Sequence, residues 1–125
     1  MNTSRTFLLL GALGGFFTVA LGAFAAHGLK AILSPGLLQT FQTGVDYQGL
    51  HSLALLAVGL LLRTQDAAAL RLSGWAFASG ILVFSGSLYL LALTDARWLG
   101  AITPFGGAAF LLGWAALAWG VARQR

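Results

Sequence analysis

Four long apolar stretches, separated by short polar segments, dominate the pattern of hydrophobic and polar positions along the chain. They run approximately over residues 6–26, 47–62, 72–93 and 104–121. Each approaches the roughly 20 apolar residues that a helix needs to cross about 30 Å of hydrocarbon. The pattern therefore predicts an all-α integral membrane protein, a single domain over residues 1–125 in which four membrane-spanning helices form a bundle.

The residues before the second stretch, 35–46, place apolar and polar side chains on opposite sides of a helix. The apolar side carries Leu37, Leu38, Phe41 and Val45, and the polar side carries Gln39, Gln42, Thr43 and Asp46. Ser34 and Pro35 supply an N-cap hydroxyl and a proline at the first helical position. Thr103 and Pro104 repeat this arrangement before the fourth stretch. We expect an amphipathic interfacial helix on the outer side, leading into the second span with or without a bend.

Charged residues make up only 8% of the chain, and their positions indicate an orientation. With the N-terminus on the inner side, that side carries five basic residues and one acidic residue, and the outer side carries two of each. The inner set is Arg5, Arg63, Arg71, Arg123, Arg125 and Asp66, and the outer set is Lys30, Arg97, Asp46 and Asp95. By the positive-inside rule, both termini are predicted to be cytoplasmic.

Composition excludes several classes of protein. A mean hydropathy of +0.86, with a charged fraction far below the average of about 25%, excludes a soluble domain. The net charge of +4 does not indicate a nucleic-acid partner, because the basic residues form no stripe. The chain has no Cys, which excludes disulfides, thiolate metal sites and cysteine nucleophiles. It also has no Glu, and no Asp within a span, so a carboxylate-driven pump is not expected.

The 17 glycines raise the question of a nucleotide site, but their spacing indicates helix packing. The first span carries Gly11, Gly15 and Gly22 on one face. The fourth span carries Gly106, Gly113 and Gly120 at seven-residue intervals. Small residues at such spacings let membrane helices approach closely. Neither a G-x-G-x-x-G sequence after a strand nor a Walker sequence is present. These glycines are therefore predicted to mediate helix contacts, within the bundle or between subunits.

Polar side chains that could bind a ligand gather in the outer half of the predicted bundle. They are His27, Tyr47, Gln48, His51, Ser85, Ser87, Tyr89 and Thr103. In a structural interpretation, His51 bonds to one of these serines or to Tyr89, because an unpaired polar group in hydrocarbon is costly. In a functional interpretation, the cluster binds a lipid, a small molecule or a quinone. Metal or haem ligation by His27 and His51 is a weaker alternative, and no metal, cofactor or catalytic residue is predicted.

These observations favour a non-enzymatic structural or accessory membrane protein. Its expected partners are membrane lipids, a hydrophobic small molecule or a partner helix, with a homo-oligomer or a membrane complex as the larger assembly. One alternative is a redox protein that binds a metal, haem or quinone through its histidines. Another is a small transporter or channel subunit, which would have to oligomerise because four helices enclose little aqueous space.

Four short stretches, in this order along the chain, carry a resemblance to a known family. They are GAFAAHGL at 22–29, YQGLHSLALL at 47–56, FSGSLY at 84–89 and TPFGG at 103–107, the last followed by Gly113-Trp114. With them the chain resembles the YgdD/YwdK-like small bacterial membrane proteins with mitochondrial relatives, grouped as domain of unknown function 423. Ala25 and Gly49-Leu50 depart mildly from the family pattern. The resemblance implies a four-helix protein of the bacterial inner membrane, and it brings no established activity.

Overall fold

The computed structural model describes residues 2–124, and within this range the chain is helical throughout, with short connections. The elements are α1 (Thr3–His27), η1 (Leu29–Ala31), α2 (Pro35–Thr64), α3 (Ala68–Gly80), η2 (Ile81–Ser85), α4 (Gly86–Thr94), η3 (Arg97–Ala101) and α5 (Thr103–Ala122). Because α3, the π-helical η2 and α4 follow one another without a gap, they form one continuous rod. Four helical segments of residues 2–124 are long and apolar enough to cross a membrane, which confirms the predicted all-α, four-span architecture.

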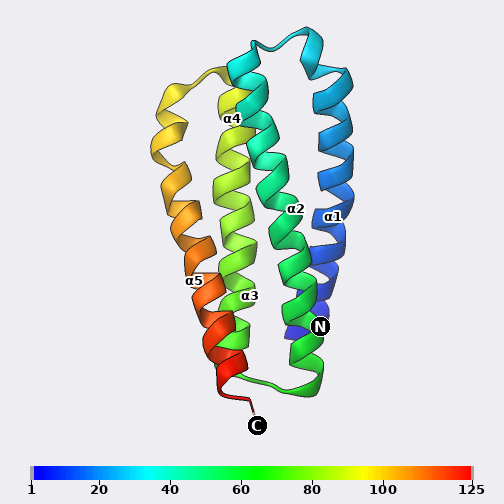
Figure 1. Cartoon of the computed structure of the whole chain (residues 1–125), viewed down its shortest axis with the longest axis vertical. Coiled ribbons are helices and arrows are strands. Elements are labelled where there is room, and N and C mark those ends of the chain that lie inside the picture. The colour runs from blue at the N-terminus through cyan, green and yellow to red at the C-terminus, as the bar shows by residue number, and fades with distance from the viewer. Residues whose placement is uncertain (1, 125) are drawn as a thin grey trace.

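The rods run antiparallel, with α2 and the α3–α4 rod in the centre (Figure 1). The edge helix α1 packs mainly against α2, and the other edge helix, α5, packs mainly against α3 and η2. Both ends of the chain lie at the same end of the molecule (Figure 1).

The amphipathic segment 35–46 is the first part of α2 and not a separate interfacial helix. The helix is 30 residues long, about 45 Å, and its N-cap Ser34 accepts a hydrogen bond from the Leu37 N–H at 3.3 Å. The apolar side of the segment buries Phe41 and Val45 in a cluster with residues of α1, η1 and α4. This segment therefore stands upright in the bundle, because neighbouring helices cover the side that was expected to face lipid.

Phenylalanine rings packed on glycines join α3 to the two edge helices, α1 and α5. The rings of Phe7, Phe110 and Phe77 lie over Gly74, Gly80 and Gly113, respectively. At each of these glycines a Cβ atom would approach the ring to under 3.0 Å, closer than real contacts allow. A larger residue would push the rings out and separate the helices.

The six glycines expected to mediate packing do not contribute equally. On α5, Gly106 and Gly120 face Phe84 and Leu70, and there too a Cβ atom would approach the neighbour to under 3.0 Å. On α1, Gly11 lies against α2, but Gly15 has no neighbouring atom within 4 Å of such a position. At Gly22 the nearest atom is a Val45 methyl at an ordinary 3.5 Å. Gly15 therefore lies off the strip of α1 that packs on α2, whereas the three glycines of α5 all face residues of α3 and η2.

Candidate functional site

The polar residues of the outer half do not form one cluster, because the structure divides them among separate contacts. The Tyr89 hydroxyl donates to Gln48 Oε1 at 2.6 Å. The amide of Gln48 in turn donates to the Gly14 carbonyl at 2.9 Å. This chain of bonds joins α4, α2 and α1, and it uses both ends of the buried Gln48 amide.

The serines of the third span bond to helix backbones and to Thr103. The Ser85 hydroxyl, at the end of the π-helix η2, donates to the Gly44 carbonyl of α2 at 2.7 Å. Ser87 donates to the Phe84 carbonyl at 2.9 Å, and its oxygen lies 2.6 Å from that of Thr103. Thr103 is itself the first residue of α5 and makes no N-cap bond, contrary to its expected capping role. These hydroxyls join helices and are not free to act on a ligand.

His51 has two partners, and neither is a residue that was expected to bind it. Its Nδ1 lies 2.7 Å from the Tyr47 carbonyl oxygen, and the Trp114 indole donates to its Nε2 at 3.0 Å. A carbonyl can only accept and an indole can only donate, so the imidazole is neutral with its proton on Nδ1. Both ring nitrogens are therefore used, and the expected bonds to the serines or to Tyr89 do not form.

Aromatic rings surround this histidine. The His51 ring stacks on Phe110 with centroids 3.5 Å apart and planes only 7° from parallel. Trp114 packs edge-on against Phe77 at 4.9 Å, and Tyr47 lies 4.7 Å from Phe84. Stacking and hydrogen bonding together hold the imidazole in one orientation, and His51 is only 2% exposed.

A groove of about 550 Å³ runs beside this aromatic group, between α2 and α5. Its lining is mainly apolar and consists of Tyr47, Leu50, His51, Phe84, Pro104, Gly107, Ala108, Phe110, Leu111 and Trp114. From Pro104 to Trp114 it follows ten residues of α5, about 15 Å. Tyr47 is 43% exposed, and within residues 2–124 its hydroxyl has no hydrogen-bond partner. The groove thus offers a long apolar surface with one free polar group.

Two residues central to this site, Phe110 and Trp114, were not among the candidates from the sequence. Their spacing of four positions puts both on one face of α5. An aromatic pair of this kind, at the depth of an intramembrane histidine, is the signal that could have identified them.

His27 lies apart from the other candidates, exposed at the end of α1. The Gly14 carbonyl bonds to Gln48, so these two residues of α1 and α2 lie at the same level of the bundle. His27 is thirteen residues, about 20 Å, farther along α1 than Gly14. His51 is on the far side of Gln48 from His27, so the two histidines cannot share a metal ion. Residues 2–124 also contain no group of three or more His, Cys, Asp or Glu side chains that could hold one.

Comparisons with known proteins place the chain among small membrane proteins. Residues 21–107 match a family model described as "Protein of unknown function (DUF423)". A UPF0382 membrane protein of Haemophilus influenzae is 52% identical over 115 residues, 91% of each chain. The UPF0382 inner membrane protein YgdD of Escherichia coli is 40% identical over 98% of this chain and 94% of its own. The UPF0382 membrane protein YwdK of Bacillus subtilis is 42% identical over 88% of this chain and 90% of its own. No solved structure matches the chain.

Proposed function

Since the chain belongs to the DUF423 family of UPF0382 membrane proteins, whose function is unknown, we propose that it is a non-enzymatic accessory protein that binds lipid in the bacterial inner membrane. Its α2–α5 groove holds one hydrocarbon chain of an outer-leaflet phospholipid. The name of the Escherichia coli relative, an inner membrane protein, supports the location. The charge distribution supports an orientation with the termini in the cytoplasm and the groove in the outer half.

The observation that carries the proposal is the match between the groove and one leaflet of a bilayer. The groove follows α5 for about 15 Å, which is half of a hydrocarbon core about 30 Å thick. Its volume of about 550 Å³ lies within the usual range of small-molecule sites, about 300–1,000 Å³. A single extended hydrocarbon chain has the length and the chemistry that this surface accommodates.

The positions of the polar groups support a lipid over a more polar ligand. Tyr47 follows the exposed Asp46 directly and lies at the outer end of the groove, where its free hydroxyl can bond to an oxygen of the lipid. Deeper in the groove, His51 offers no free nitrogen, because Tyr47 and Trp114 occupy both. The same bonds disfavour metal or haem ligation by His51, since a metal would have to displace the Trp114 indole.

The test fills the groove without disturbing the core. A Cβ atom at Gly107 would lie 3.9 Å from the Phe84 ring, so Gly107→Leu projects into the groove with little strain. The matched control is Gly86→Leu, because Gly86 lies in a membrane-spanning rod, outside the groove, with no atom within 4 Å of its Cβ position. Trp114 lines the groove and reports on its occupant once Trp75, Trp98 and Trp119 are replaced by phenylalanine.

In detergent, a phospholipid with a brominated acyl chain is added to this single-tryptophan protein, and quenching of Trp114 fluorescence is followed. We expect quenching that saturates at one lipid per protein, that is lost in Gly107→Leu and that persists in Gly86→Leu. Quenching that never saturates, or that is the same in all three proteins, would show only general contact with lipid and would overturn the proposal.

A further inference from the structure

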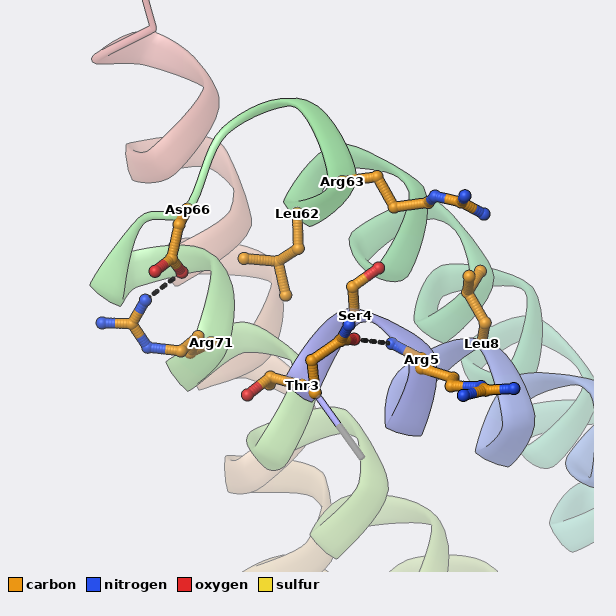
Figure 2. Close-up of a pocket in the computed structure, with 9 residues that line it drawn as sticks. Thr3, Ser4, Arg5, Leu8, Leu62, Arg63, Asp66 and Arg71 are labelled. Carbon is orange, nitrogen blue, oxygen red and sulfur yellow. Dashed lines mark hydrogen bonds and ion pairs between the residues drawn. The ribbon is translucent and has the colours of Figure 1, made fainter.

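A second cavity, separate from the groove, lies at the end of the bundle that carries the chain termini. Its volume is about 820 Å³. The first two turns of α1, the last turns of α2, the connection to α3 and the first turn of α3 line it (Figure 2). Most of its lining residues are polar or charged, unlike those of the groove, so it suits a different kind of ligand.

Three arginines and one aspartate give this cavity its charge. Arg71 and Asp66 form an ion pair on one side of the cavity (Figure 2). Arg5 and Arg63 extend to the other side, from α1 and α2, and neither has an acidic partner within residues 2–124 (Figure 2). The cavity thus has a net charge of +2 with two free guanidinium groups, the side chains that best match the oxygens of a phosphate.

The start of α1 adds to the attraction for an anion. Asn2 caps the helix by accepting a hydrogen bond from the Arg5 N–H at 2.8 Å. The cap leaves the backbone N–H groups of Thr3 and Ser4 without helical acceptors, at the positive end of a 25-residue helix. Both residues line the cavity. The backbone charge and the arginine charges therefore act in the same direction.

Two leucines indicate that the anion is part of a lipid. Leu8 and Leu62 line the same cavity. Leu8 lies three positions from Arg5 and Leu62 lies one position from Arg63, each toward the apolar part of its helix. A phospholipid fits this arrangement, because its phosphate would meet the arginines while the first carbons of its chains would meet the leucines. A free phosphate ion would use only the polar part of the cavity.

From this geometry we infer that the cavity binds the headgroup of an anionic phospholipid, with its phosphate between Arg5 and Arg63. Basic cavities between membrane helices recognise such headgroups, and each basic residue near the surface contributes about 1 kcal/mol, roughly fivefold in affinity. The site lies at the opposite end of the membrane span from the groove. It does not depend on whether the groove binds lipid.

Native mass spectrometry of the full chain in detergent measures the binding directly, with phosphatidylglycerol as the probe and phosphatidylcholine as the neutral comparison. We expect a clear preference for phosphatidylglycerol, and about fivefold weaker binding in Arg5→Gln and in Arg63→Gln. The matched control is Arg123→Gln, which removes one charge at the same end of the bundle but lies outside the cavity, against Trp119. Its affinity should be unchanged.

One variant should bind more tightly, a result that misfolding cannot produce. Asp66→Asn removes the acidic side chain from the cavity and frees Arg71, so phosphatidylglycerol affinity should rise about fivefold. Equal binding of the two lipids, or an equal loss in Arg123→Gln, would overturn the inference by showing no recognition or only general attraction. Complete displacement of the lipid by equimolar inorganic phosphate would overturn the lipid assignment in favour of a free anion.

Discussion

Replacing Trp114 with phenylalanine tests whether the contact between α2 and α5 depends on the His51 hydrogen bond. The indole donates to Nε2 at 3.0 Å, and because His51 is only 2% exposed, water cannot replace the lost donor. Phenylalanine keeps a ring near Phe77, whose centroid lies 4.9 Å from that of the Trp114 ring. The change therefore removes chiefly one hydrogen bond and leaves a buried acceptor unpaired.

The expected cost of this change follows from two ranges. A buried acceptor without a partner costs about 1–3 kcal/mol in soluble proteins. Hydrogen bonds between membrane helices contribute about 0.6 kcal/mol on average and about 1.7 kcal/mol at most. Since the acceptor of the Trp114 bond is a buried, stacked histidine, we expect a loss near the upper membrane value. A loss of about 1.4 kcal/mol in the free energy of unfolding corresponds to a tenfold change in the equilibrium constant.

The measurement is unfolding in mixed micelles by increasing SDS, followed by circular dichroism. Trp119→Phe is the matched control, because Trp119 lies on the same helix, is 60% exposed and has no histidine partner. A double-mutant cycle with His51→Leu isolates the pair, and the double variant should lose less stability than the two single variants combined. If Trp114→Phe cost no more than Trp119→Phe, and the cycle showed no coupling, the reasoning about this bond would be refuted.

Three further substitutions test the packing, each measured by the same unfolding assay. Ser52→Ala should raise the free energy of unfolding by up to about 1 kcal/mol, because the buried Ser52 hydroxyl has no partner within residues 2–124; a loss of stability would contradict this. Gly74→Ala should lower the free energy of unfolding by about 1–3 kcal/mol, since the new methyl group would collide with Phe7. A neutral result would show that the Phe7 ring moves freely. Gly15→Ala should be neutral or stabilise by up to about 1 kcal/mol, because nothing lies near that position and alanine favours helix; destabilisation would reveal an unseen contact.

The number of spans and the start of α2 could be predicted because both depend on neighbouring residues. A long apolar run must be helical in a membrane, whatever it packs against. Ser34 and Pro35 are an example, since capping α2 requires only the residues that follow them. Whether segment 35–46 is a separate helix or the first part of the second span could not be predicted from neighbouring residues. It depended on whether other helices would cover Phe41 and Val45, which is a property of the whole bundle.

The partner of His51 shows where sequence reasoning stops. The level of His51 relative to its neighbours on α2 follows from a constant rise of about 1.5 Å per residue, so it could be estimated. The direction in which its side chain points depends on how each helix is rotated, and the π-helix η2 changes that rotation within the third span. Ser85 consequently bonds to Gly44, and the histidine turns to Trp114 instead. The regular helix expected over 72–93 gave no indication that Ser85 and His51 would have these other partners.

Glycines and buried polar side chains act together in this bundle. In four places a polar side chain bonds to the carbonyl of a glycine on another helix. The pairs are Ser4 with Gly59, Gln48 with Gly14, Ser73 with Gly113, and Ser85 with Gly44, at 2.7 to 2.9 Å. A glycine has no side chain to shield its carbonyl, so a hydroxyl or an amide on the neighbouring helix can reach the free lone pair of the oxygen. Each bond in turn offsets part of the free-energy cost of placing a polar group in hydrocarbon. Most of the buried polar side chains are therefore used for helix contacts, which leaves the Tyr47 hydroxyl as a polar group beside the groove without a partner within residues 2–124.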